Sequence, residues 1–264
     1  MAKRFLKIRR SKPYQYLKDK FLYVRAYVRW KLNPYPKDIG DNPIFVFNHI
    51  PKCGGTSLNI VLRKWFILRK DYSPHELKFP DPEKLEIEFS KFENSPPKLS
   101  EIKPWEILGG HYHNSKLRLS KRFPEIYENP GLKLITFIRE PLEHHLSMYK
   151  YGKKRGHDFV KNLSLSQYLE NDCNFLAGAL ECNLENYKSR IDEYFFIGTL
   201  EEFQYSMERL ARKLGKTELE TIPFENQTNS KTLFNSLSED EIIKFKKNNI
   251  LDYLIYEYVK NSSN

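Results

Sequence analysis

Cysteine is scarce in this chain of 264 residues, and long apolar runs are missing from it. The three cysteines, Cys53, Cys173 and Cys182, form an odd and sparse set. This argues against a disulfide-stapled secreted framework and favours a reducing compartment, with a Cys173–Cys182 bridge left open. No window approaches the roughly 18 apolar residues of a membrane span, and the basic N-terminus lacks the apolar centre of a signal peptide. These absences predict a cytoplasmic protein.

Acidic residues are nearly absent from the first 32 positions. This segment holds eleven Lys or Arg residues against Asp19 alone, so it accounts for the whole formal charge of +10. Five apolar side chains in it recur at steps of three and four residues, which predicts one face of a helix: Tyr14, Leu17, Phe21, Val24 and Val28. Such a basic amphipathic helix either attaches to an anionic membrane surface or acidic partner, or packs on the domain with a solvated outer face. We expect a basic helical segment, 1–40, and a main domain, 41–264.

Short apolar runs without polar alternation mark the strands of the main domain. They are typical of parallel strands that are covered on both faces, and they occupy Ile44–Asn48, Glu106–Gly110, Leu132–Ile138 and Tyr194–Gly198. Helical patterns alternate with them. This order predicts an α/β class, with a P-loop-like, three-layer fold around a central, mostly parallel sheet flanked by helices.

The helices are expected at four places. The first is capped by Thr56 or Ser57 and runs to about Arg69. The others begin at Pro141 and continue to about Lys150, run from Phe203 to Leu214, and follow a capping box at Ser238 through Tyr258. Six prolines between positions 70 and 104 predict an irregular connection there, with short helices at most.

Polar residues stand directly after the predicted strands, where open α/β sheets bind their ligands. They are Lys52 with its Gly pair, His111, Arg139 and Thr199. A glycine loop with exposed backbone N–H groups and Lys52 can hold a terminal phosphate or sulfate, and Arg139 offers a planar fork for a second phosphate. A Walker A motif is excluded because Lys52 precedes the glycines, and no Asp ends a strand to help bind magnesium. The pattern favours a doubly anionic, metal-independent donor.

At this point the sequence resembles a known family. H-I-P-K-C-G-G-T-S-L at His49–Leu58 is similar to the 5′-phosphosulfate loop of the carbohydrate-type sulfotransferases, the group of heparan sulfate 2-O-sulfotransferase and related bacterial enzymes. L-G-G-H-Y at Leu108–Tyr112 resembles the stretch with the family's catalytic base, and Ile135–Tyr149 resembles its 3′-phosphate motif. Phe196–Phe203 and Leu251–Tyr258 resemble its later core. The likeness spans roughly the whole main domain, which would then be a sulfotransferase domain.

The resemblance implies a co-substrate, 3′-phosphoadenosine 5′-phosphosulfate (PAPS), and no metal. Its 5′ end would be bound by Lys52, Cys53, Gly54, Gly55, Thr56 and Ser57, and its 3′-phosphate by Arg139 and Ser147. Sulfuryl transfer would be an in-line displacement, in which Lys52 neutralises charge on the transferred group and His111 takes the proton of the acceptor hydroxyl. The chain departs from the usual pattern at Cys53, where Thr is frequent, and at Glu140, where Asp is usual and where the change could alter the cap of the next helix.

Several of these roles have competitors. His113, His75 and Glu76 are alternative bases, and Arg139 could pair with Glu140 or Glu143 instead of a phosphate. His144 and His145 are expected on a helix surface. Asn174-Phe175 is a candidate for acceptor contact, and the run Lys150, Lys153, Lys154 and Arg155 is either a solvated face or a surface that attracts an anionic glycan.

Three functions stay open at this stage. The first is a PAPS-dependent sulfotransferase that acts on a carbohydrate or glycolipid hydroxyl, in the cytoplasm and resting on a membrane through residues 1–32. The second is a P-loop-type nucleotide phosphotransferase, which would need magnesium. The third is a non-catalytic module that binds anionic glycans or membranes. A nucleic-acid reader is disfavoured, because the basic residues are not interleaved with an aromatic stacking platform on a recognised motif.

Overall fold

The computed structural model describes residues 12–74, 82–113, 117–171, 173–216 and 231–262. The strands are β1 (Ile44–Asn48), β2 (Ile67–Lys70), β3 (Glu106–Gly110), β4 (Leu132–Ile138) and β5 (Phe196–Thr199). The longer helices are α2 (Lys12–Leu32), α3 (Gly55–Trp65), α4 (Pro82–Asn94), α6 (Pro141–Arg155), α11 (Phe203–Lys213), α13 (Glu239–Asn248) and α14 (Ile250–Ser262). The shorter ones are α5 (Leu119–Arg122), α7 (Asp158–Lys161), α8 (Leu165–Asn171), α9 (Phe175–Leu180), α10 (Tyr187–Asp192) and α12 (Lys231–Phe234), with 3-10 turns at Lys37–Ile39 and Leu99–Glu101.

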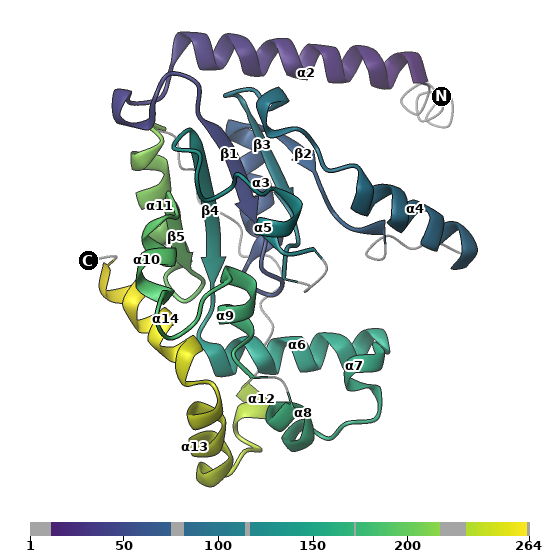
Figure 1. Cartoon of the computed structure of the whole chain (residues 1–264), viewed down its shortest axis with the longest axis vertical. Coiled ribbons are helices and arrows are strands. Elements are labelled where there is room, and N and C mark those ends of the chain that lie inside the picture. The colour runs from purple at the N-terminus through teal and green to yellow at the C-terminus, as the bar shows by residue number, and fades with distance from the viewer. Residues whose placement is uncertain (1–11, 75–81, 114–116, 172, 217–230, 263–264) are drawn as a thin grey trace, which may run out of the picture.

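The five strands form one parallel sheet in the order β2-β3-β1-β4-β5. β1 lies in the centre, where Asn48 is opposite both Gly110 of β3 and Thr136 of β4. Because all strands run the same way, their carboxyl ends meet at one edge, which we call the carboxyl edge (Figure 1). The predicted α/β class with a parallel sheet flanked by helices is confirmed.

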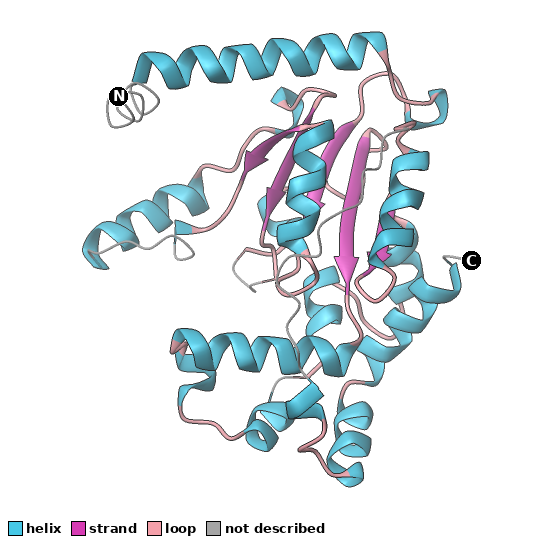
Figure 2. Cartoon of the chain, turned by 180° about the vertical axis from the view of Figure 1, so that it is seen from behind, coloured by secondary structure: helices cyan, strands magenta, loops and turns pink. Residues whose placement is uncertain are grey.

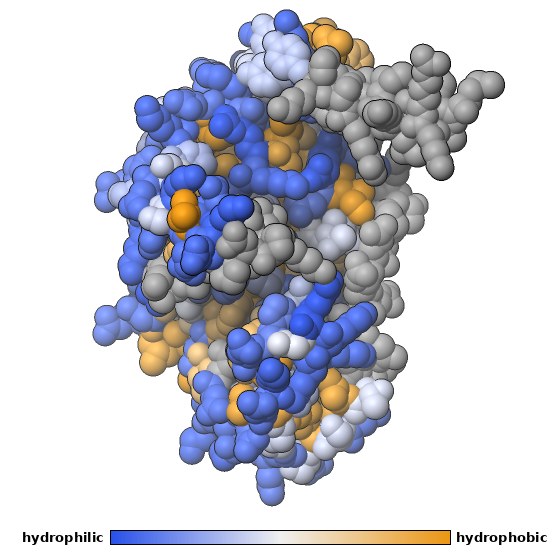
Figure 3. All heavy atoms as spheres, turned by 90° about the vertical axis from the view of Figure 1, so that its right-hand side faces the viewer, coloured by the Kyte–Doolittle hydropathy of each residue, from blue (hydrophilic) through white to orange (hydrophobic). Residues whose placement is uncertain are grey.

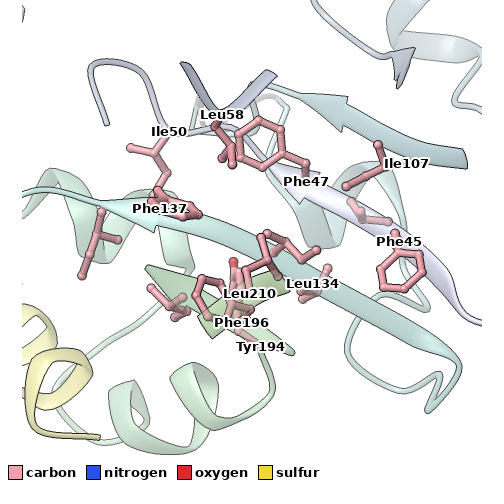
Figure 4. Close-up of a cluster of buried hydrophobic side chains, with 14 of the residues drawn as sticks. Phe45, Phe47, Ile50, Leu58, Ile107, Leu134, Phe137, Tyr194, Phe196 and Leu210 are labelled. Atoms are coloured by element: carbon pink, nitrogen blue, oxygen red, sulfur yellow. The ribbon is translucent and has the colours of Figure 1, made fainter. Parts of the chain in front are cut away.

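The central strands are buried because both faces of the sheet are covered. Phe45, Val46 and Phe47 of β1 are at most 1% exposed, and α3 crosses one face of the sheet (Figure 2). Figure 4 shows Phe45 and Phe47 in one cluster with Phe137 of β4. This packing explains why the strand runs show no polar alternation.

One strand was not expected. β1, β3 and β4 have the predicted bounds, and β5 lies close to the predicted stretch, but the helix expected to reach Arg69 ends at Trp65. Phe66 takes an extended conformation (φ −126°, ψ 162°), and the chain continues as β2 beside β3. The apolar run from Trp65 fits a buried helix or a buried strand equally well, and pairing with a distant strand decides between them.

Two further helix predictions were wrong. The connection expected to be irregular contains the 13-residue helix α4, whose Pro82 occupies the first turn, where proline is tolerated. The last helix is interrupted at Asn249, a fully buried residue whose side-chain oxygen accepts a hydrogen bond from Asn174 N, at 2.7 Å. The capping box of Ser238 with Glu241 is confirmed at the start of α13.

Helix α2 confirms the expected N-terminal helix and lies across the edge of the sheet opposite the carboxyl edge (Figures 1 and 2). In the ranges described here, no helix combines the length and apolar character needed to cross a bilayer. Cys53, Cys173 and Cys182 form no disulfide, so the Cys173–Cys182 bridge is not formed.

Candidate functional site

The carboxyl edge brings together the residues that the sequence places after the strands. The loop His49–Gly54 follows β1 at the centre, His111 follows β3 on one side, and Arg139 follows β4 on the other. The loop is tied to the sheet by two hydrogen bonds: His49 N donates to Gly110 O at 2.9 Å, and Thr136 Oγ1 donates to Asn48 O at 2.7 Å. Thr199, at the end of β5, is buried, and its N–H donates to Ser206 Oγ. The site therefore centres on the loop after β1.

Two left-handed residues shape this loop. Gly54 has φ 80° and Lys52 has φ 63°, and Gly54 directly precedes the first turn of α3. The expectation that Thr56 or Ser57 caps this helix was wrong: Gly54 occupies the N-cap position, and no side chain caps it. The N–H groups of the first helical turn have no partner within the helix, and the helix dipole makes this end favourable for an anion.

Lys52 is a partly buried cation. Burial and then the charge of Arg139 lower the pKa of Lys52 below the usual 10.5. Its Nζ atom lies 4.7 Å from the ring centroid of Tyr151 on α6, a cation–π distance. No carboxylate in the described part of the chain forms an ion pair with it. Lys52 thus stands two residues before the N-cap of α3 without a carboxylate partner among the described residues, and this suits an anion.

Arg139 forms an ion pair with Glu143. Its Nη2 atom lies 3.1 Å from Glu143 Oε2, one turn along α6, and its side chain is 12% exposed. Glu140 caps α6 by accepting from Glu143 N at 2.7 Å, and it also accepts from Tyr253 Oη. The Glu at position 140 thus performs the capping that the sequence left in doubt. Arg139 pairs with Glu143, one of the two carboxylates that were expected to compete with a phosphate. Its role toward a phosphate stays a prediction.

His111 belongs to a group of side chains that packs against the loop. The ring centroids of His111 and His49 are 4.3 Å apart, and those of His111 and Tyr72 are 4.9 Å apart. His49 Nδ1 shares a hydrogen bond of 2.9 Å with Tyr72 Oη. On the other side, the ring of His49 touches Gly55 so closely that a Cβ atom there would lie 1.6 Å from His49 Nε2. The ring of His49 therefore lies between His111 and Gly55, at the start of α3.

His49 is a site residue that sequence reasoning did not single out. Burial, followed by the charges of His111 and His113, lowers the pKa of His49 well below its usual value of 6.5, so its ring stays neutral. The ring centroid of His113, a competing base, lies 5.8 Å from that of His111. The place of His49 at the strand end was visible in the sequence, but its packing on Gly55 required the structure.

The expectation that His144 and His145 lie on a helix surface was wrong. They are 1% and 0% exposed, because α6 is enclosed by the loop after β1 on one side and by α8 and α13 on the other. His144 Nε2 donates to Pro51 O at 3.0 Å, directly before Lys52. Burial, with His145 second, lowers the pKa of His144 well below 6.5. His144 thus supports the loop from behind as a neutral imidazole.

The remaining predicted binding residues differ in access. Thr56 is exposed, Ser57 is 4% exposed, and Cys53 is buried, which raises the pKa of its thiol. Ser147 has no exposed surface, so a phosphate could reach its hydroxyl only if a neighbouring side chain moved. The roles of these four residues stay predictions.

Other candidates lie beside the site or outside the described residues. His75 and Glu76 belong to the latter group. Asn174 binds the backbone of Asn248 and Leu251, whereas the ring of Phe175 lies between His113 and His144, at 5.5 and 4.7 Å. The basic run is exposed at the end of α6. Within the described ranges, no group of three or more His, Cys, Asp or Glu side chains could hold a metal ion.

Comparisons with known proteins give only a distant likeness. No protein-family model and no curated protein matches the chain. It is similar to a solved structure of a sulfotransferase from Alicyclobacillus acidocaldarius, with 13% identity and a TM-score of 0.42, over 82% of this chain and 96% of that one. It is also similar to mouse sulfotransferase SULT7A1 complexed with PAP, with 18% identity and a TM-score of 0.40, over 76% of this chain and 65% of that one. At these values an assignment of function has to rest on the residues of the site.

Proposed function

We propose that this protein is a sulfotransferase that moves the sulfuryl group of PAPS to a hydroxyl of a carbohydrate or glycolipid. The observation that carries the proposal is the loop after β1, where Lys52, whose pKa is lowered by burial and by the charge of Arg139, stands just before the uncapped start of α3. The resemblance of this loop and of the Arg139 stretch to sulfotransferase motifs indicates which anions would bind, namely the 5′ end and the 3′-phosphate of PAPS. The lysine before the glycines argues against a magnesium-dependent phosphotransferase.

In the proposed reaction, each group has a separate task. The N–H groups at the start of α3 and Lys52 hold the sulfuryl end of the donor, and Arg139 binds its 3′-phosphate. The acceptor oxygen attacks sulfur in line, the bond from sulfur to the 5′-phosphate oxygen breaks, and adenosine 3′,5′-bisphosphate leaves. Lys52 neutralises charge on the departing oxygen.

His111 takes the proton from the acceptor hydroxyl. Its position supports this role, because the neighbouring ring of His49 touches Gly55 at the start of α3. A base must lie within hydrogen-bond reach of the hydroxyl that attacks the bound donor, and His111 is next to the loop that would hold the donor. His49 and His144 act as positioning residues: one packs on Gly55, and the other holds Pro51.

The exposed basic run of α6 favours an acceptor of anionic character. Tyr151, which lies within this run, contacts Lys52, and the Arg155 guanidinium carbon is 5.7 Å from the same ring centroid. A negatively charged glycan arriving at the site would therefore meet Lys150, Lys153 and Lys154 close by.

The donor site is tested by calorimetric binding of adenosine 3′,5′-bisphosphate without magnesium. We expect Arg139→Ala to weaken binding by ~2 kcal/mol or more, the scale of a lost hydrogen bond to a charged group. Arg212→Ala, on the exposed face of α11, is the control and should bind as wild type does. Absence of binding to the wild type, with binding of ATP and magnesium instead, would favour the phosphotransferase.

The base is tested in the same preparation. His111→Gln should retain binding of the bisphosphate while losing sulfuryl transfer from labelled PAPS to an acceptor by ~10²-fold or more, the usual contribution of a general base. If His111→Gln transfers sulfate at the wild-type rate while His113→Gln does not, the base has been assigned to the wrong histidine.

A further inference from the structure

Helix α2 has one face on the domain and one face in solvent. The inner face carries Tyr23, Tyr27 and Trp30, whose ring centroids lie 5.6, 5.0 and 5.2 Å from that of Trp105, just before β3. Arg29 adds a hydrogen bond to Lys64 O. These contacts fix the helix on the end of the sheet, so its opposite face must point away from the domain.

The outward face is apolar, although a periodic apolar face of a helix usually packs against the rest of the protein. The side chains on it recur at steps of four, three, four and four residues and are strongly exposed: Leu17 (64%), Phe21 (65%), Val24 (51%), Val28 (44%) and Leu32 (82%). We call them the apolar stripe. Exposure of this stripe to water over four turns of helix is unfavourable, since burial of each of these side chains would lower the free energy.

Basic side chains border the apolar stripe on both sides. At 3.6 residues per turn, Lys18 and Arg25 fall along one margin and Lys20 and Lys31 along the other, and all four are exposed. Asp19 is the one acidic residue of α2, and it falls toward the inner face. Figure 3 looks toward the N-terminal end of α2 and shows apolar and hydrophilic side chains together at the top of the molecule. The residues before α2 add Lys3, Arg4, Lys7, Arg9 and Arg10 to the same segment.

We propose that the apolar stripe binds an anionic lipid bilayer, with α2 lying flat in its surface. Such a bilayer offers an apolar interior below a negatively charged headgroup layer, which matches the stripe and both of its basic margins. A second copy of the chain matches less well, because pairing two apolar stripes would bring two sets of basic margins together. The fixed inner face means that the helix meets the membrane already folded and oriented.

Flotation with vesicles tests the proposal with the full chain. The probes are vesicles of phosphatidylcholine alone and of phosphatidylcholine mixed with phosphatidylserine. We expect binding to the mixed vesicles, weaker binding to the neutral ones, and release by salt. Leu17→Ser together with Phe21→Ser should lower the partition coefficient about tenfold or more, because two large apolar side chains no longer enter the bilayer.

The matched controls lie on α13, far from α2. Ile243→Ser removes an apolar side chain of similar exposure, 63%, and should leave vesicle binding unchanged. Lys20→Glu with Lys31→Glu should weaken binding to the mixed vesicles at least about fivefold, whereas Lys246→Glu with Lys247→Glu should not. Binding of adenosine 3′,5′-bisphosphate by each variant shows that the variant is folded. This binding does not depend on the membrane.

Two outcomes would overturn the proposal. One is that the wild type stays in solution with both kinds of vesicle while it is monomeric by light scattering. The other is that the wild type is dimeric and Leu17→Ser with Phe21→Ser makes it monomeric without any change in vesicle binding. The second result would assign the apolar stripe to another copy of the chain.

Discussion

At the scale of single residues, the site depends on Lys52. A non-glycine residue with φ 63° is uncommon, and the pKa of this one is lowered by burial and by the charge of Arg139. Neither feature stabilises the unliganded protein, and the charge of Lys52 becomes favourable when an anion binds beside it. The sequence revealed the two cations, but it did not show the left-handed conformation of Lys52 or its contact with Tyr151 on α6, which is distant in the chain.

The lowered pKa of Lys52 predicts how donor binding depends on pH. An anionic ligand prefers the protonated amine, so the affinity for adenosine 3′,5′-bisphosphate should fall as pH rises through the lowered pKa, before the usual lysine value of 10.5 is reached. Lys52→Arg keeps its charge throughout this range, so its affinity should stay level. Calorimetry at a series of alkaline pH values measures both. An identical fall in wild type and Lys52→Arg would show that another group titrates.

At the scale of elements, the turn from β1 to α3 is restricted by its neighbours. Gly55 has no room for a side chain, because the ring of His49 occupies the place of a Cβ atom. We expect Gly55→Ala to displace His49 and to weaken binding of adenosine 3′,5′-bisphosphate about tenfold or more, the scale of a lost interaction of ~1.4 kcal/mol.

Gly178→Ala is the matched control for that substitution. Gly178 lies in helix α9, and nothing is within 4 Å of its Cβ position. The change should leave binding intact and raise the free energy of unfolding by ~0.5–1 kcal/mol, because alanine favours a helix. Denaturant unfolding measures the stability of both variants. Wild-type binding by Gly55→Ala would mean that His49 can move without disturbing the loop.

The elements also show which part of the fold the sequence could predict. β1, β3 and β4 were found at their observed bounds because each is a short apolar run that ends in turn residues. β2 was missed because its neighbours Trp65 and Phe66 continue the apolar pattern of α3, and the decisive pairing is with β3, almost 40 residues later. His144 and His145 were misplaced because two adjacent helical residues are both buried only when partners enclose the helix on several sides.

At the scale of the whole molecule, burial of neutral histidines predicts acid sensitivity. The pKa values of His49 and His144 lie well below 6.5, so the unfolded chain takes up protons at these groups first as pH falls below 6.5. The free energy of unfolding should therefore fall by up to ~1.4 kcal/mol per group and pH unit, until the lowered pKa values are passed. Above 6.5 this loss is absent.

His144→Gln separates one of these contributions. Glutamine does not titrate, so the variant should lose less stability than wild type between about pH 7 and pH 5, as measured by urea unfolding at each pH. Glu140 acts in the opposite sense, because burial raises its pKa, and the comparison with wild type removes its effect. His157→Gln, at an exposed position, is the matched substitution. Equal slopes for His144→Gln and wild type would contradict the prediction.

The position of α2 at one end of the sheet, with the loop after β1 at the other, sets the direction from which the acceptor of the proposed reaction can arrive. A strand of five residues spans about 17 Å, so a protein resting on a bilayer through α2 would hold His111 and Lys52 well above the headgroups, facing the surrounding water. Sugars attached to lipids of that same membrane would be out of reach unless a long spacer raised them. The proposed sulfotransferase would then work as a surface-tethered catalyst for glycans that diffuse in from solution or extend from a facing membrane.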